Sequence, residues 1–197
     1  HSLICDISDF FIKKNSIIYE LGCATGRLTK MIAEHNNHKN NAKFIGLDIE
    51  EDMINYANAN TNDKRIEFHT EDVVDYEYER SDFIIAYYTF QFLSPSKRQS
   101  LFDKLYESLN WGGCLILFEK VRGSDARFQD IMTSLYTDFK LRAGYTPEQI
   151  IGKSRSLKGI LEPYSSNANI DMMRRAGFED INTIFKYICF EGFIAIK

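Results

Sequence analysis

The chain has 197 residues and a net charge of −4, and 44% of its residues are hydrophobic. This length fits a single α/β domain over residues 1–197, and the apolar content supports a sizeable core, which excludes a wholly disordered chain. No apolar run is long enough to span a membrane, and no basic block matches the footprint of a nucleic-acid-binding face. The four cysteines are far apart and lack metal-ligand spacing, so we expect reduced thiols, no metal site and a cytoplasmic location.

Short apolar runs alternate with longer helical patterns over the first 120 residues. Strands are predicted over residues 17–21, 44–48, 66–69, 83–87 and 115–118, and helices over residues 27–35, 50–60 and 95–109. Strands separated by helices of this length form βαβ units and build a parallel sheet. A turn is predicted at Trp111-Gly112-Gly113, just before the fifth strand.

The pattern changes after Lys120. Residues 122–169 contain no convincing strand, and helical patterns cover residues 127–142 and 147–161, so we interpret this segment as a helical insertion over the mouth of the sheet. The tail has strand-like runs over residues 181–188 and 192–196, joined by a short polar and glycine-bearing link, and these are expected to pair as an antiparallel hairpin. A parallel sheet closed by a C-terminal antiparallel hairpin is typical of the Rossmann-like α/β fold of class I methyltransferases.

A glycine-bearing loop follows the first predicted strand. In the run Glu20-Leu21-Gly22-Cys23-Ala24-Thr25-Gly26, the strand ends in an acid and a helix begins at once. The two glycines allow a sharp turn and a close approach of a ligand to the main chain. The E-x-G-x-x-x-G spacing differs from the dinucleotide fingerprint and favours S-adenosylmethionine, while a turn without a ligand is the alternative. The first part of the predicted cofactor site is therefore Glu20, Gly22, Cys23, Ala24 and Gly26.

Two further acids stand where the second and third strands end. Asp48 can accept hydrogen bonds from both ribose hydroxyls. Similarity to the methyltransferase fold implies that the position of Asp72 takes the adenine amino group, beside the backbone N–H of Val73. Each acid alone is more simply a solvated loop residue. Three acids at successive strand ends, however, predict one ligand site, because ligands of open α/β sheets bind at that edge. Ile49, Met53 and Tyr87 complete the predicted cofactor set.

Aromatic residues are frequent in the insertion and near the strand ends. Ordinary packing explains any one of them, but as a group they suggest an aromatic acceptor pocket. The predicted substrate-binding residues are Tyr88, Tyr136, Tyr145, Arg155 and Tyr164. No residue identifies itself as a general base, so the catalytic residues stay open.

Several runs resemble the carboxy-S-adenosylmethionine synthase family. They are Tyr19-Glu20-Leu21-Gly22-Cys23, Gln91-Phe92-Leu93-Ser94-Pro95, Asp138-Phe139-Lys140, Arg175-Ala176-Gly177-Phe178 and Phe190-Glu191-Gly192-Phe193. The resemblance spans nearly the whole chain. It implies a dimeric enzyme that binds S-adenosylmethionine, carboxylates its methyl group with prephenate, and supplies a partner enzyme of tRNA wobble-uridine modification. Residues 1–13 correspond to the last helix before the first strand of that family, so a further segment is expected ahead of His1.

The departures from that family fall near the expected chemistry. Tyr87 takes the position of an asparagine, and Phe118 that of a serine. Ser154 takes the position of the arginine that, in the family, holds the added carboxylate, and Arg155 lies one residue late, or about 100° around a helix axis. Since a guanidinium recognises a carboxylate through fixed bidentate geometry, that rotation matters.

We therefore predict an S-adenosylmethionine-dependent methyltransferase that acts on a small-molecule acceptor. The synthase reaction with prephenate is the alternative, and a non-catalytic cofactor-binding protein is a further one. A homodimer is expected from the resemblance. The negative charge argues against direct binding of nucleic acid.

Overall fold

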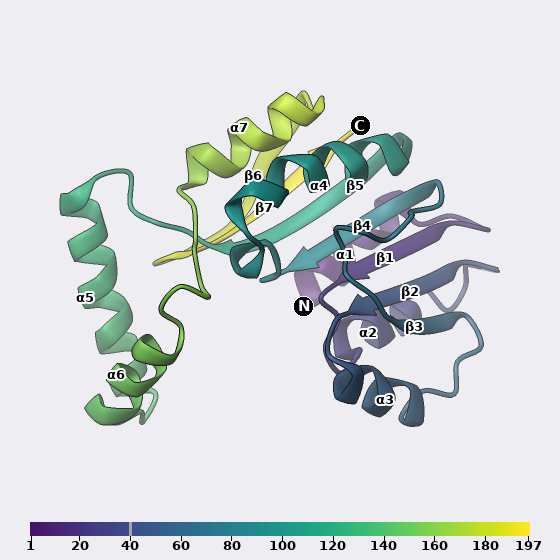
Figure 1. Ribbon diagram of the computed structural model, residues 1–197. Helices are drawn as coiled ribbons and strands as arrows, with labels where there is room; N and C mark the ends of the chain where they lie inside the picture. The colour runs from purple at the N-terminus through teal and green to yellow at the C-terminus, as the bar shows by residue number, and fades with distance from the viewer. Residues whose placement is uncertain (40) are drawn as a thin grey trace.

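A seven-stranded mixed sheet in the order β3-β2-β1-β4-β5-β7-β6 runs through the molecule (Figure 1). The computed structural model describes residues 1–39 and 41–197. Strands β1 to β5 are parallel, and the C-terminal hairpin adds β7 antiparallel to β5, with β6 at the edge. The strands are β1 (Ile17–Leu21), β2 (Lys43–Asp48), β3 (Ile66–Thr70), β4 (Ser81–Tyr87), β5 (Leu109–Lys120), β6 (Asp180–Tyr187) and β7 (Phe190–Ile196). This order confirms the predicted fold class.

Helices cover both faces of the sheet. The helices are α1 (Ser2–Phe11), α2 (Arg27–His35), α3 (Glu51–Ala59), α4 (Pro95–Ser108), α5 (Ala126–Arg142), α6 (Pro147–Ser156) and α7 (Ser166–Ala176), with a short 3-10 turn η1 (Phe90–Phe92). Helices α1 and α2 pack on one face, where they bury alternate residues such as Ile18, Phe83 and Ile116. Helices α4 and α7 pack on the other. None of the helices in the described residues combines the length and apolar character that a bilayer span needs.

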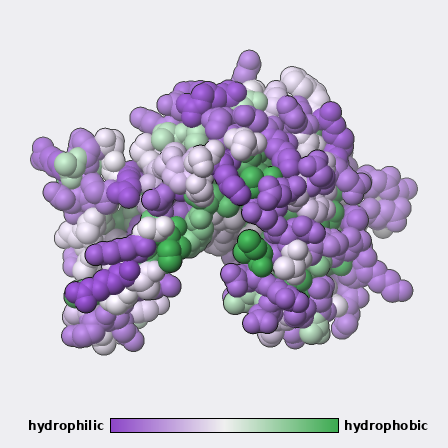
Figure 2. Space-filling model, in the orientation of Figure 1, coloured by the Kyte–Doolittle hydropathy of each residue, from purple (hydrophilic) through white to green (hydrophobic). Residues whose placement is uncertain are grey.

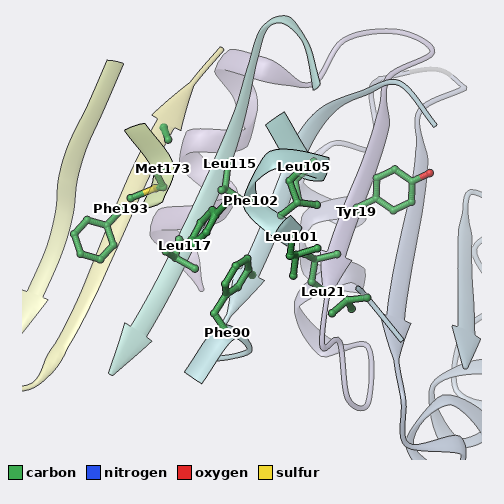
Figure 3. Close-up of a cluster of buried hydrophobic side chains, with 14 of the residues drawn as sticks. Tyr19, Leu21, Phe90, Leu101, Phe102, Leu105, Leu115, Leu117, Met173 and Phe193 are labelled. Carbon is green, nitrogen blue, oxygen red and sulfur yellow. The ribbon is translucent and has the colours of Figure 1, made fainter. Parts of the chain in front are cut away.

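The core between α4, α7 and the sheet is the larger of the two. Figure 3 shows Phe90, Leu101 and Phe102 against the strand residues Leu115 and Leu117, all of them almost fully buried. This alternation of strand residues between the two faces follows from the two-residue period of a strand. Because β4 ends at Tyr87, Tyr88 and the short turn η1 that follows it lie at the carboxyl edge of the sheet.

The fifth strand is longer than predicted. The expected turn at Trp111-Gly112-Gly113 is wrong, because β5 runs through it. The register against β4 shifts between the pairs Ser81–Leu109 and Phe83–Cys114, so the extra residues form an irregularity within the strand. Gly112 has φ +79°, a conformation that favours glycine, and its N–H donates to the Lys197 carbonyl. The glycine pair does mark a position of positive φ, but that position belongs to a bulge within β5 and not to a chain reversal.

The insertion leaves the sheet at the carboxyl end of β5. Helices α5 and α6, here called the arm, stand beside the sheet as a separate limb in Figure 1. Asp125 and Thr146 accept hydrogen bonds from backbone N–H groups three residues on and so cap the two helices. The predicted helix over residues 147–161 is shorter than expected and ends at Ser156, ahead of Gly159 at φ +71°. The hairpin link is also not the predicted polar and glycine-bearing one, because Ile188 and Cys189 form the turn.

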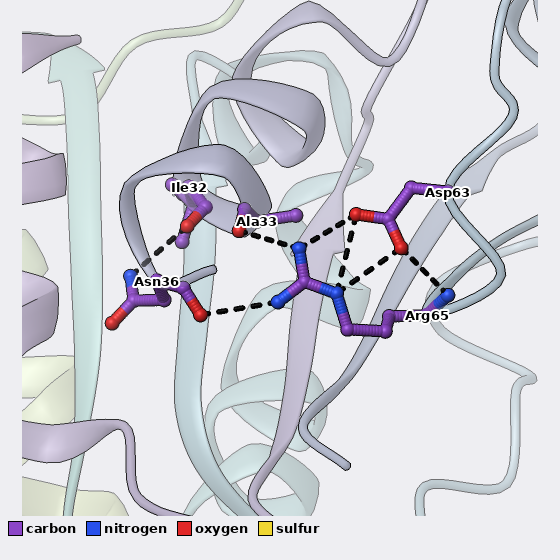
Figure 4. Close-up of polar contacts among 5 residues, drawn as sticks. All are labelled: Ile32, Ala33, Asn36, Asp63 and Arg65. Carbon is purple, nitrogen blue, oxygen red and sulfur yellow. Dashed lines mark hydrogen bonds and ion pairs between the residues drawn. The ribbon is translucent and has the colours of Figure 1, made fainter. Parts of the chain in front are cut away.

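A polar network fixes the end of α2, the helix that follows the glycine-bearing loop. Arg65, just before β3, donates to the carbonyls of Ala33 and Asn36 at 2.8 and 3.1 Å and pairs with Asp63 at 2.6 Å (Figure 4). A cation near the last carbonyls of a helix is favourable for the helix dipole as well. These contacts hold α2, and with it the loop at its other end, against β2 and β3.

Candidate cofactor and acceptor site

The loop after β1 is built for a close approach of main chain to ligand. Gly22 and Gly26 have φ of +70° and +68°, and a Cβ at Gly22 would lie 2.5 Å from the Thr89 hydroxyl. Backbone N–H groups of Gly22 and Cys23 donate to the Leu47 carbonyl at 2.8 and 3.0 Å. The loop is therefore tied to β2, and Gly22 leaves its main chain open to a neighbouring cavity.

Asp48, at the end of β2, faces that cavity. One carboxylate oxygen accepts the N–H of Ala24 at 2.7 Å, and the other accepts the N–H of Glu50 at 3.0 Å. Ala24 has φ +47°, so this hydrogen bond helps to hold a conformation that alanine disfavours. Each carboxylate oxygen keeps a free lone pair, which a hydroxyl could use.

A cavity of about 570 Å³ opens along the carboxyl ends of β1, β2, β3 and β4. Of the predicted cofactor residues it is lined by Gly22, Asp48, Ile49, Asp72 and Val73. It is large enough for a nucleoside-sized ligand. Glycine backbone at one end, two carboxylates that accept hydrogen bonds, and apolar walls suit S-adenosylmethionine. We call this space the cofactor cavity.

The other predicted cofactor residues lie outside its lining. The Cys23 side chain is buried, and Met53 is exposed on α3. Tyr87 packs its ring 4.9 Å from that of His1 and 4.5 Å from that of Tyr88. Ala24 and Gly26 shape the loop rather than the wall. Tyr87, which takes the asparagine position of the family, contacts Tyr88 but lines neither of the two largest cavities along this edge.

Glu20 is almost fully buried, and the Thr29 hydroxyl of α2 donates a hydrogen bond to its carboxylate. Burial raises the pKa of Glu20 to about 7, although the Thr29 hydrogen bond opposes the rise. The side chain contacts α2 and does not line the cofactor cavity. Its observed contacts are those of a buried anchor for the loop.

A second cavity, of about 640 Å³, lies between the arm and the sheet edge, and we call it the arm cavity. Figure 2 shows the hollow between the arm and the body of the molecule, with apolar side chains on both sides. Tyr88 and Phe92 line both cavities, so the two spaces meet there. The cationic side chains that line the arm cavity are Lys120, Arg122, Lys140, Lys153 and Lys158, against Glu162 as the one acid among the lining residues.

The cations of the arm cavity are close enough to interact. Lys120 and Lys140 place their ammonium groups 5.0 and 4.2 Å from the Tyr136 ring centre. The pKa of Lys140 is lowered by partial burial and then by the charge of Lys120. An anionic ligand between these side chains would relieve their repulsion.

The predicted substrate residues separate into two groups. Tyr88 and Tyr136 line the arm cavity. Tyr145 is exposed at the far end of the arm, Arg155 is exposed outside the cavity lining, and Tyr164 packs under the Arg98 guanidinium at 4.3 Å. Ser154, one residue before Arg155, does line the cavity. The helical rotation expected between these two positions is thus present.

Sequence reasoning missed several lining residues. Thr89, Phe92, Leu93 and Lys97 line the cofactor cavity from the segment after β4. The run Gln91-Phe92-Leu93 was noticed only as part of a family pattern. A strand end followed by a short polar-aromatic run is the signal that could have found them, because the carboxyl edge of a parallel sheet is where ligands bind.

This sheet order, with a cavity at the carboxyl edge bordered by Gly22, Asp48 and Asp72, is the layout of the class I S-adenosylmethionine-dependent methyltransferases. Residues 18–113 match the family model described as a methyltransferase domain. The carboxy-S-adenosyl-L-methionine synthase of Staphylococcus epidermidis is 37% identical over 197 residues, which cover 100% of this chain and 86% of that protein. The Campylobacter lari protein of the same name is 33% identical and covers 99% and 83%. The chain belongs to the carboxy-S-adenosyl-L-methionine synthase family.

Solved structures share the fold at low sequence identity. Human N-acetylserotonin methyltransferase in complex with SAM has a TM-score of 0.63 and 17% identity, over 92% of this chain and 47% of that one. Phosphoethanolamine N-methyltransferase 2 of Haemonchus contortus in complex with S-adenosyl-L-methionine has a TM-score of 0.71 and 13% identity, over 100% and 52%. The chain spans about half the length of these two structures, and the likeness concerns the fold.

Proposed function

We propose that this enzyme transfers the methyl group of S-adenosylmethionine to a small anionic acceptor in the arm cavity. The observation that carries the proposal is the junction of the two cavities at Tyr88 and Phe92, with an aromatic and cationic lining on the acceptor side. A molecule of modest size fits about 640 Å³. The net charge of −4 argues against a nucleic acid as the acceptor.

The protein's part in this reaction is mostly alignment. The cofactor supplies a methyl group that is already activated as part of a sulfonium. Asp48 would hold the ribose hydroxyls, Asp72 the adenine amino group, and the lysines of the arm cavity the acceptor's negative charge. Holding two reactants in line removes much of the entropic barrier to their reaction.

Methyl transfer is favoured over carboxylation by the residue at one position. Ser154 lines the arm cavity where the family resemblance implies an arginine, and Arg155 is exposed outside the lining. A serine hydroxyl gives a new carboxylate no opposite charge, and a closed pocket strongly disfavours an unpaired anion.

Carboxylation of the cofactor is the second candidate. It is favoured by the names of the relatives and by Lys153 and Lys158, which bring cations to the same cavity from either side of Ser154. Either lysine could stand in for the guanidinium as a point charge, although without its bidentate geometry.

The deciding experiment incubates the purified protein with S-adenosylmethionine and prephenate and, in separate reactions, with S-adenosylmethionine and each of a panel of small carboxylates. Mass analysis of the cofactor and of the acceptor follows. Methyl transfer predicts the demethylated cofactor together with a methylated carboxylate. A carboxylated cofactor that depends on prephenate would instead establish the synthase reaction and overturn our proposal.

We further propose a homodimer that forms through the arm. Helix α5 has no buried residue, and its exposed Phe128, Ile131, Leu135 and Phe139 lie along one helical stripe. A second copy would remove this apolar surface from water. The four free cysteines are all buried, which fits a reducing cytoplasmic location.

A further inference from the structure

Tyr88 stands at the junction of the two cavities in a conformation that tyrosine disfavours. Its φ is +62°, in the left-handed region where a Cβ crowds the backbone. Its ring packs 5.6 Å from that of Phe190, which in turn lies 5.3 Å from Tyr136 of the arm. A strained residue persists only where its surroundings hold it, and such residues gather at functional sites.

Three hydrogen bonds hold the chain around Tyr88. Its own N–H donates to the Phe118 carbonyl at 2.8 Å, and the Thr89 hydroxyl donates to the Leu21 carbonyl at 2.6 Å. The N–H of Phe90 donates to the carboxylate of Glu119 at 3.0 Å. The first two bonds end on main chain of neighbouring strands. Among the described residues, Glu119 is therefore the one side chain outside residues 88–90 that accepts a hydrogen bond from them.

Glu119 is part of a reciprocal pair of contacts. While its carboxylate accepts from Phe90, the side-chain oxygen of Gln91 accepts the N–H of Lys120 at 3.0 Å. Two consecutive residues of β5 are thus joined to two consecutive residues of η1. The Gln91 carbonyl also accepts the N–H of Glu162, in the segment that returns from the arm, at 2.9 Å. The segment between the cavities is therefore fixed on one side to β5 and on the other to the arm.

We infer that Tyr88 is the residue that separates the cofactor cavity from the acceptor space, and that Glu119 is a positioning residue that acts through it. The inference rests on the proposed function, since it assigns the acceptor to the arm cavity. The inference predicts a lower affinity for the cofactor in a variant that lacks the Glu119 carboxylate, although Glu119 lines neither cavity.

The chain offers a matched control in Glu191. This residue lies directly opposite Glu119 in the β5–β7 register and is as deeply buried, at 3% exposure against 2%. Its carboxylate is bonded to Ser166, Thr183 and Lys186, away from the segment around Tyr88. Replacing Glu191 removes a buried glutamate from the same sheet without touching that segment.

The test is a double-mutant cycle between Glu119 and Tyr88, in which calorimetry measures the affinity for S-adenosylmethionine. We expect Glu119→Ala to raise the dissociation constant about tenfold, Glu119→Gln to restore most of the affinity, and Glu191→Ala to change it less than about twofold. In a Tyr88→Ala background, Glu119→Ala should have almost no further effect.

Two results would overturn the inference. One is an equal effect of Glu119→Ala with and without Tyr88, and the other is an equal loss in Glu191→Ala. If Glu119→Ala does not fold, Gln91→Met breaks the reciprocal contact to Lys120 and enters the same cycle. Because the cycle measures cofactor binding and not turnover, it decides on the positioning role even if no methyl transfer is found.

Discussion

At the scale of single residues, the assignment of Asp48 is the most direct to test. Asp48→Ala would leave ribose hydroxyls unpaired and would also free the N–H of Ala24, which it accepts at 2.7 Å. We expect the affinity for S-adenosylmethionine to fall by about 1–3 kcal/mol. Asp52→Asn, an exposed change in the first turn of α3, is the control and should bind normally. Calorimetry that finds equal affinity in Asp48→Ala would remove the ribose role.

The strain at Tyr88 makes a second prediction with a reversal of sign. At φ +62°, glycine is better accommodated than alanine, so Tyr88→Gly should be more stable than Tyr88→Ala by about 1 kcal/mol. At the preceding position, in strand β4, alanine should be the more stable by about 0.5–1 kcal/mol. Urea unfolding of the four variants, including Tyr87→Gly and Tyr87→Ala, measures both differences. The same order at both positions would contradict the strained conformation.

At the scale of elements, the sequence predicted the central parallel strands well. These strands bury residues on both faces of the sheet, as β4 does with Ile84 and Ile85, and therefore appear as short apolar runs. The prediction failed where a long-range contact decides. The glycine pair before Cys114 looks like a turn, yet pairing with β4 and the chain end makes it a bulge. In the site, the strand-end acids Asp48 and Asp72 could be predicted from position alone. The position of Tyr87 outside the lining of the cofactor cavity could not be predicted in this way, because it depends on the face of the sheet toward which that residue points.

Contacts within one copy of the chain explain the position of the arm poorly, since no residue of α5 is buried. If a second copy covers the stripe, Leu135→Glu should convert the dimer to a monomer in light-scattering measurements, because a charge would be buried against apolar side chains. Ser134→Glu, about 100° around the helix, is the matched control and should leave the dimer intact. A wild-type protein that is monomeric at all concentrations would dismiss the arm as a dimer interface.

At the scale of the whole molecule, two buried carboxyl groups couple folding to pH. Burial raises the pKa of Glu20 to about 7 and that of Glu119 to about 8, against an ordinary value of 4.5. The folded state therefore binds more protons than the unfolded state between these values. The contribution of these two groups to the free energy of unfolding is therefore fully present below about pH 4.5. It is lost as the pH rises through 7 and 8, at up to about 1.4 kcal/mol per pH unit for each proton.

Urea unfolding between pH 5.5 and 8.5 measures this slope. Both groups contribute to the slope below about pH 7, and only Glu119 contributes between about 7 and 8. Glu119→Gln should therefore flatten the curve above about pH 7 and reduce its slope below, whereas Glu20→Gln should reduce the slope only below about pH 7, because a neutral amide has no proton to lose. The double variant should lose most of the slope in this interval. A free energy of unfolding that does not fall with pH in the wild-type protein over this interval would show that these two carboxyl groups are already ionised in the fold, held by the Thr29 hydroxyl and the backbone N–H of Phe90.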